Sequence, residues 1–206
     1  MIDIVLPNNN EAEFLLMAKN LGFNGVIFLY SLKEYLDRSQ TNNIKGIETE
    51  KKFKTYNGIL ADNKDINKTK NTLKNHKAFI AVRSSYDDRE VIEKRKANLI
   101  FSFEDNPKRD AMHQRYSGLN HILCKLAYNN NIIIGFSLKI VLDSKNKPLI
   151  MGRIMQNIML CRKFKVNTIA ASFANTPLQM RSPHDIRSLF EALGNKNISF
   201  YSGEHK

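Results

Sequence analysis

Short apolar runs alternate with amphipathic helical segments along most of this chain, and this alternation is the feature that most constrains its fold. Several runs, such as residues 25–30, are apolar without a break, as strands buried on both faces are. Strands separated by single helices pair in parallel through right-handed crossovers. The candidate strands are residues 2–6, 25–30, 57–61, 78–82, 98–103, 132–136, 166–172 and 198–201.

The candidate helices lie between these strands and show apolar residues at helical spacing or good capping residues. They cover residues 14–21, 65–75, 87–96, 119–127, 151–164 and 183–193. About eight strand–helix units predict an α/β fold, a compact (β/α)8 TIM-barrel-like domain that occupies residues 1–206. Such barrels usually need about 250 residues, so some helices must be short or missing. An open doubly wound sheet is the alternative.

The segment of residues 38–55 interrupts this pattern because it is polar, charged and poor in apolar residues. Segments of this kind connect elements at the protein surface. We interpret it as an exposed connection and not as a domain boundary, because the strand–helix alternation resumes unchanged beyond it.

The charge balance restricts the kind of partner. The chain has 32 Lys and Arg against 20 Asp and Glu, a net charge of +12. Such an excess favours a polyanion, first of all a nucleic acid. An anionic membrane surface, or a generic basic protein without such a partner, are the alternatives. No window approaches the roughly 20 apolar residues of a membrane span.

The N-terminus and the cysteines indicate the compartment. The first residues lack a basic region, and Asp3 and Pro7 break their apolar run, which argues against a signal peptide. Cys124 and Cys161 lack the spacing of a redox or metal motif, and two cysteines are no disulfide framework. A reducing, cytoplasmic location fits best, and both thiols are expected in the core.

Barrels of this kind are most often enzymes, yet the sequence offers little catalytic chemistry. No two of the five histidines are spaced as a metal-binding pair, and no phosphate-binding glycine motif is present. The carboxylates of Asp3, Glu104 and Asp105 lie near predicted strand ends, where barrel catalysts are found. They form a weak candidate magnesium site, and solvated or ion-paired carboxylates are the more common case.

Basic residues are the strongest local signal. Between residues 151 and 190 there are six cations and a single acid, Asp185. On a helical wheel of residues 151–164, one face carries Met151, Ile154, Met155, Ile158, Met159 and Cys161 and is expected to pack in the core. The opposite face carries Arg153, Gln156, Asn157 and Lys163, which form either an ordinary solvated surface or a strip that contacts phosphates.

Further cations follow other predicted strands or precede a helix N-terminus, which itself favours anions. The residues that we expect to contact a nucleic acid are Arg83, Arg109, His113, Arg153, Lys163 and Arg181. We expect no catalytic residue and no metal ligand among them.

Three blocks of sequence resemble a known family. The first contains Asp3, Ile4 and Pro7 followed by Ala18, Lys19, Leu21, Gly22, Phe23, Gly25 and Val26. The second spans residues 119–127, with 131–132 and 135–137. The third contains Arg153, Asn157, residues 160–166, 171–172, 180–183 and 193–194. In order and spacing, these blocks resemble the ribonuclease P protein component 3 family of archaea and eukaryotes; residues 38–55 match nothing in it.

The resemblance implies a TIM-barrel-like subunit of ribonuclease P, the ribonucleoprotein endoribonuclease that removes the 5′ leader of precursor tRNA by hydrolysis. It implies that magnesium is held by the catalytic RNA subunit and that this chain carries no cofactor. The implied partners are ribonuclease P RNA, precursor tRNA within the holoenzyme, ribonuclease P protein component 2 and other protein subunits, with no membrane. A metal-dependent phosphoesterase of the histidinol-phosphatase-like barrels is the alternative, against which the missing histidine pair counts.

Overall fold

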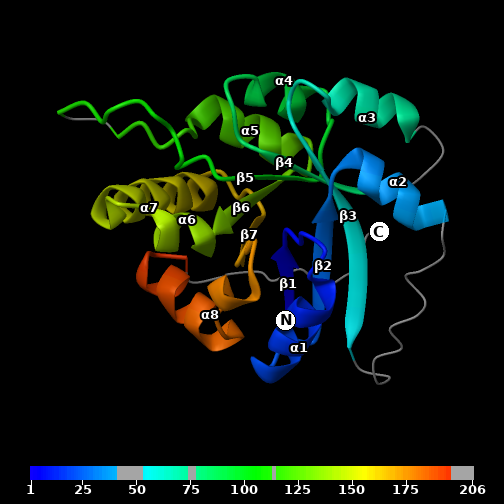
Figure 1. Cartoon of the computed structure of the whole chain (residues 1–206). Coiled ribbons are helices and arrows are strands. Elements are labelled where there is room, and N and C mark those ends of the chain that lie inside the picture. Colours follow the sequence, from blue (N-terminus) through cyan, green and yellow to red (C-terminus); the bar gives the residue numbers. More distant parts are fainter. Residues whose placement is uncertain (41–52, 74–77, 113–114, 196–206) are drawn as a thin grey trace.

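Seven parallel strands form a single sheet whose spatial order is the order of the sequence (Figure 1). The computed structural model describes residues 1–40, 53–73, 78–112 and 115–195. Each neighbouring pair of strands is parallel, which confirms the crossover pattern expected from the sequence. The strands are β1 (Ile2–Val5), β2 (Gly25–Tyr30), β3 (Lys54–Ala61), β4 (Phe79–Arg83), β5 (Leu99–Phe101), β6 (Ile133–Ser137) and β7 (Thr168–Ala171).

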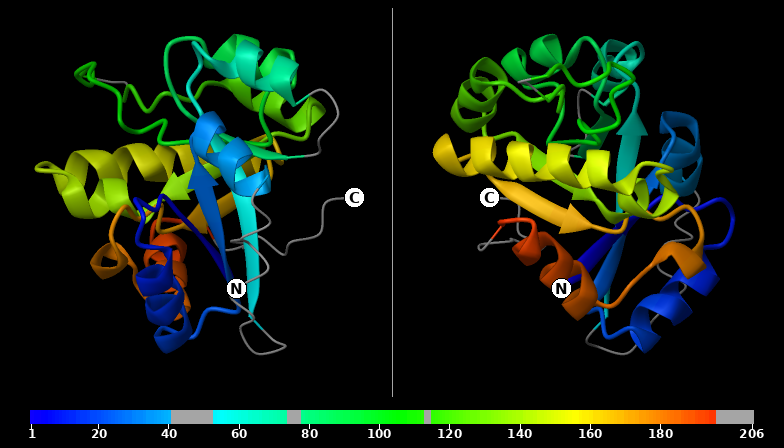
Figure 2. Two further views of the ribbon diagram at one scale, coloured as in Figure 1. Left: turned by 45° about the vertical axis from the view of Figure 1, so that its right-hand side comes forward. Right: turned by 90° about the vertical axis from the view of Figure 1, so that its left-hand side faces the viewer.

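Helices follow the strands and lie around the outside of the sheet, with the long α7 running alongside β7 (Figure 2). They are α1 (Glu11–Asn20), α2 (Leu32–Gln40), α3 (Ile66–Thr72), α4 (Asp88–Glu93), α5 (His121–Asn129), α6 (Leu138–Asp143), α7 (Lys147–Lys163) and α8 (Pro183–Ala192). A short 3-10 helix, η2 (Pro177–Gln179), precedes α8. Within the described residues, no helix has the length and apolar character needed to cross a membrane.

The sheet curls until β1 meets the chain that follows β7. The backbone N–H of Phe173 donates to the carbonyl of Ile4 at 2.8 Å, and Leu6 donates to the carbonyl of Ala174 at 2.8 Å. The buried carboxylate of Asp3 accepts the N–H of Ser172 at 2.7 Å. These contacts make the barrel nearly closed, as expected, and they exclude the open doubly wound sheet.

The sequence predicted eight strands, and the described residues contain seven. Seven of the candidate strands are present, and the eighth candidate, residues 198–201, lies outside the described residues. Two short helices, α2 and α6, were not expected from the sequence. Helix α2 extends into the segment 38–55, and β3 begins at Lys54, inside the same segment.

The core has two layers because side chains alternate between the two faces of each strand. Ile27 and Leu29 of β2 point into the barrel, whereas Val26 and Phe28 pack outward beneath the helices. The outer layer also contains Cys124 of α5 and Cys161 of α7, which are both buried. This confirms that both cysteines are core residues.

The narrow interior leaves no room for a side chain at Gly135. A Cβ atom built there would lie 2.9 Å from Cβ of Phe101 and 3.0 Å from Cδ1 of Leu99. We expect Gly135→Ala to lower the free energy of unfolding by about 1–3 kcal/mol, the usual cost of overpacking a core. Urea denaturation measures this, and Ser188→Ala on the exposed side of α8 should change stability by no more than about 0.5 kcal/mol. Equal stability of the two variants would show that the interior is loosely packed.

Candidate nucleic-acid interface

The expected RNA-contacting residues lie at opposite ends of the barrel. Arg83 is the last residue of β4 and Arg181 precedes α8, so both lie on the side where the parallel strands end. Lys163 ends α7 just before β7 begins, and therefore lies on the side where the strands begin. These three cations therefore do not lie at one end of the barrel. His113 lies outside the described residues.

Arg153 is the residue whose position differs most from the expectation. Its side chain is buried, with 1% of its surface exposed, although the wheel placed it on a solvated face. The guanidinium donates to the carboxylate of Asp110, with N–O distances of 3.0 and 2.8 Å. It also donates to three backbone carbonyls, those of Glu104, Asn106 and Lys108. The expectation of an exposed Arg153 is therefore wrong.

The groups held by Arg153 belong to the connection between β5 and α5, of which the structure describes residues 102–112 and 115–120. We call these described residues the β5–α5 arm. It extends away from the barrel (Figure 1). Although partial burial acts to raise it, the pKa of Asp110 lies below its ordinary value because Arg153 and the N–H of Tyr116 donate hydrogen bonds to it. Asp110 therefore stays ionised at neutral pH, and the buried ion pair with Arg153 fixes the base of the arm.

Asn157, one turn further along α7, holds the arm at a second place. Its side-chain N–H groups donate to Oε1 of Glu104 at 2.8 Å and to the carbonyl of Ser117 at 2.7 Å. Gln156 donates to Oγ of Ser117 at 3.0 Å. Arg153, Gln156 and Asn157 of the polar face thus form a socket for the arm, whereas Lys163 at the end of the helix takes no part in it.

The other face of α7 also departs from the expectation. Ile154, Ile158 and Cys161 are buried as expected, but Met155 and Met159 are 47% and 55% exposed. These two methionines line a groove of about 340 Å³ together with Leu193, Gly194, Arg115 and Arg162. The α7 surface that faces away from the barrel is therefore apolar with cations beside it.

Held in this way, the arm presents its charged and apolar side chains to solvent. Arg109 is exposed, and Nζ of Lys108 lies 6.0 Å from the centre of the Tyr116 ring. Met112 is 93% exposed. The arm therefore carries the kind of side chains that contact phosphates and bases.

A second basic group surrounds Phe164 at the amino ends of the strands. The Nζ atoms of Lys125 and Lys163 lie 5.9 and 5.8 Å from the centre of its ring. Arg162 and Lys165 are adjacent and exposed. Among the described residues, no acid forms an ion pair with any of these four cations, which we call the amino-end cluster. The sequence indicated the basic run 162–165 but not the contribution of Lys125.

Comparison with known proteins assigns this barrel to a family. The profile of the family described as RNase P subunit p30 matches residues 1–199. The chain belongs to the RNase P subunit p30 family. It is 22% identical over 188 residues to ribonuclease P protein component 3 of Methanocaldococcus jannaschii, a match that covers 89% of this chain and 78% of that protein. It is 24% identical over 195 residues to the component 3 of Methanothermobacter thermautotrophicus, covering 91% and 77%.

A solved structure shares the fold of this p30 chain. A chain in the cryo-EM structure of archaeal ribonuclease P with mature tRNA superposes with a TM-score of 0.74 at 21% identity. The match covers 94% of this chain and 83% of that one. The resemblance seen in the sequence is thereby confirmed for the family and for the barrel.

The phosphoesterase alternative is not favoured, because its candidate carboxylates do not converge. Asp3 is bonded to Ser172, Glu104 to Asn157, and Asp105 to Arg83. In the part of the p30 chain that the structure describes, no three His, Cys, Asp or Glu side chains are grouped as metal ligands would be. The structure thus engages each of these three carboxylates in a separate interaction.

The buried carboxyl of Glu104 makes the stability of this p30 barrel depend on pH. Burial raises its pKa to about 7, and the hydrogen bond from Asn157 offsets this only in part. The folded state therefore favours the protonated acid, so this contribution to stability is fully present below about pH 4.5 and is lost as the pH rises through about 7.

Glu104→Gln keeps the oxygen that accepts the Asn157 N–H but cannot ionise. We expect this variant to be more stable than the wild type at pH 8 by about 1–3 kcal/mol, and the difference to disappear near pH 4.5. Urea denaturation at the two pH values measures it. Glu191→Gln, an exposed change on α8, should have little effect at either pH. A variant less stable than the wild type at pH 8 would show that the fold requires the charged form.

Proposed function

We propose that this chain is a non-catalytic protein subunit of ribonuclease P, the ribonucleoprotein endoribonuclease that removes the 5′ leader of precursor tRNA by hydrolysis. The observation that carries the proposal is membership of the RNase P subunit p30 family over residues 1–199. In this role the chain works in the cytoplasm and binds ribonuclease P RNA, and it meets precursor tRNA within the holoenzyme.

In the proposed complex the catalytic magnesium is held by the RNA subunit, and this chain carries no cofactor. The hydrogen bonds that Asp3 and Glu104 make within the protein support this assignment of the magnesium to the RNA subunit. Each has a buried hydrogen bond within the protein, to Ser172 and Asn157, and neither points to a shared metal position. The chain therefore contributes binding and assembly, and the holoenzyme is the enzyme.

We propose two surfaces that contact RNA, the amino-end cluster and the β5–α5 arm with Lys108 and Arg109. Unpaired cations release condensed counterions when they bind phosphate, and this release drives much of the affinity for nucleic acid. Arg83 and Arg181 lie toward the other end of the strands and are further candidates. The Arg181 guanidinium is exposed while it donates to the carbonyls of Leu178 and Met180 at 2.9 and 2.7 Å. Arg153 is not part of the proposed set because its guanidinium is buried in the socket.

Removing one charge of the amino-end cluster tests this. We expect Lys163→Ala to weaken binding to ribonuclease P RNA and to reduce the slope of log affinity against log salt concentration by about 0.7–0.9. Lys94→Ala is the matched control, since it removes one exposed charge that is paired with Glu90 at 2.8 Å. Filter binding across a salt series measures both variants. If both variants lose the same affinity for ribonuclease P RNA, the affinity depends only on net charge and the cluster is not a contact site.

We further propose that protein component 2 pairs with the exposed apolar face of α7. Exposed apolar side chains in a groove with a polar rim are typical of protein interfaces. Met155 and Met159 supply the apolar part, and Arg115 and Arg162 border it.

Met159→Glu should weaken the pairing with component 2 at least tenfold, because a carboxylate would be buried against an apolar partner. The folding of the isolated chain should be unchanged, since Met159 is 55% exposed. Leu178→Glu, at a site 79% exposed on η2, is the control and should pair normally. Isothermal titration calorimetry measures the affinities. Normal pairing by Met159→Glu would place component 2 on another surface.

A further inference from the structure

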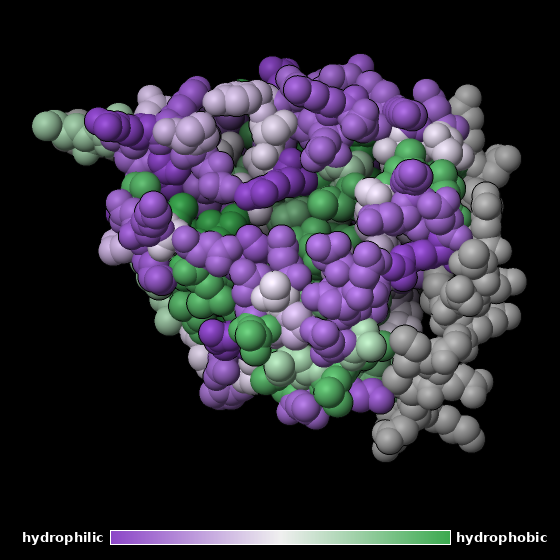
Figure 3. All heavy atoms as spheres, viewed as in Figure 1, coloured by the Kyte–Doolittle hydropathy of each residue, from purple (hydrophilic) through white to green (hydrophobic). Residues whose placement is uncertain are grey.

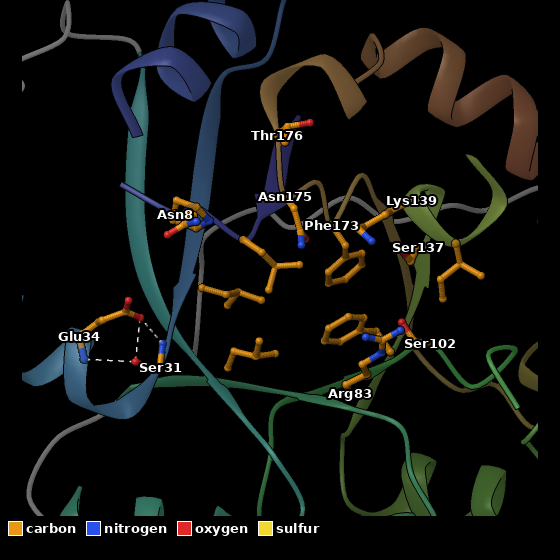
Figure 4. Close-up of a pocket in the computed structure, with 16 residues that line it drawn as sticks. Asn8, Ser31, Glu34, Arg83, Ser102, Ser137, Lys139, Phe173, Asn175 and Thr176 are labelled. Atoms are coloured by element: carbon orange, nitrogen blue, oxygen red, sulfur yellow. Dashed lines mark hydrogen bonds between the residues drawn. The ribbon is translucent and has the colours of Figure 1, made fainter. Parts of the chain in front are cut away.

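A cavity of about 580 Å³ lies at the mouth of the barrel, where the strands end. Its lining comes from the ends of β2, β3, β4, β5 and β6 and from the chain that follows β1 and β7 (Figure 4). This volume is in the range of pockets that hold small ligands, and ligand sites in barrels lie at this end. The surfaces proposed above for RNA and for component 2 do not account for it. We call it the mouth cavity.

The floor of the mouth cavity is apolar. The rings of Phe101 and Phe173 stack 4.2 Å apart at an angle of 8°, and Leu6, Leu29 and Leu60 also line it. In the space-filling view, hydrophobic side chains show in the hollow between mostly hydrophilic ones (Figure 3). The stacked rings seal the barrel interior, so a ligand can occupy only the open side above them.

Two buried serines stand in the wall without a partner for their hydroxyl groups. Ser102 is 4% exposed and Ser137 is 2% exposed, and both line the cavity. Within the described ranges, neither hydroxyl is hydrogen-bonded to another residue, and Ser137 does not use its side chain to cap α6. Ser102 also has a φ of 69°, a left-handed conformation that non-glycine residues rarely adopt. Both serines line the cavity, so their hydroxyls can donate to a ligand bound there.

Two cations stand beside these serines. Arg83 and Lys139 reach the cavity on the side where Ser102 and Ser137 lie (Figure 4). Arg83 is paired with Asp105, and Lys139 with Asp143 at 2.7 Å. Both carboxylates are about half exposed, and exposed ion pairs contribute only about 0–1 kcal/mol. A bound anion can therefore replace them at little cost.

The opposite side of the cavity carries a carboxylate and an amide instead of cations. Glu34 lies there and accepts hydrogen bonds from the hydroxyl of Ser31 at 2.7 Å and from its N–H at 3.0 Å (Figure 4). Its carboxylate repels a second anion, and Asn8 nearby offers an amide. The cavity is thus cationic at one side and suited to hydroxyl groups at the other.

We propose that the mouth cavity binds a phosphate monoester, with the phosphate between Arg83, Lys139 and the two serine hydroxyls and the organic part directed toward Asn8 and Glu34. The phosphate oxygens accept hydrogen bonds, and Arg83, Lys139 and the two serine hydroxyls can donate to them. The monoester is either a free mononucleotide or the 5′-phosphorylated end of an RNA. The inference does not depend on the role in ribonuclease P.

Calorimetric titration of the full chain at constant ionic strength tests this, with 5′-AMP and adenosine as probes. We expect 5′-AMP to bind and adenosine not to bind. Lys139→Ala and Arg83→Ala should each weaken the binding of 5′-AMP about tenfold, the usual effect of losing a hydrogen bond to a charged group. Ser137→Ala, which removes only a hydroxyl, should weaken it severalfold. Lys94→Ala, which removes an exposed cation that does not line the cavity, should bind 5′-AMP as the wild type does.

Two results would overturn the proposal. One is equal binding of 5′-AMP and adenosine, and the other is binding of 5′-AMP that the mouth variants weaken no more than Lys94→Ala does. Thermal unfolding of each variant shows that it is folded. A 5′-phosphorylated RNA dinucleotide and its 5′-hydroxyl form distinguish the source, since tighter binding of the phosphorylated dinucleotide than of 5′-AMP identifies an RNA end. The salt dependence of Lys163→Ala with ribonuclease P RNA is measured separately, so the two proposals can fail independently.

Discussion

The closure between β1 and the end of β7 is the constraint on which the rest of the structure depends. The backbone bonds that join Ile4 and Leu6 to Phe173 and Ala174 turn a twisted sheet into a barrel. The carboxylate of Asp3 completes the junction by accepting the N–H of Ser172. Burial raises the pKa of Asp3 to about 6, which shows that the junction holds this acid away from water at some cost.

Closure gives the molecule two ends with different chemistry. At the ends of the strands, side chains from most of the sheet converge on the mouth cavity, whose floor is the stacked pair Phe101 and Phe173. At the beginnings of the strands, the cations around Phe164 have no acidic partners among the described residues. A small ligand and a long polyanion can therefore be bound at separate places without competing for the same charges.

The arm depends on a different kind of interaction. A buried guanidinium is tolerated only when all of its donors are used, and Arg153 uses them on Asp110 and on three carbonyls of the arm. Removing one partner of such a pair leaves a buried charge and lowers the free energy of unfolding by about 3–5 kcal/mol. Arg153 therefore holds in place the segment that carries Lys108 and Arg109, while its own guanidinium is buried.

The sequence by itself determined the strands and most of the helices, because hydrophobic periodicity reflects which local conformation can bury its apolar side chains. It also determined the net charge, the core position of Cys124 and Cys161, and the family. It missed α2, an amphipathic helix that leads into the polar segment 38–55, and α6, which has only six residues. Only the tertiary structure decided the role of the α7 side chains. The partners of Arg153 and Asn157 lie 40 or more residues away in the sequence, so helical spacing showed a polar face but could not show what covers it. For the same reason the exposure of Met155 and Met159, and the meeting of Arg83, Ser102, Ser137 and Lys139 at one cavity, follow from barrel closure and not from any local pattern.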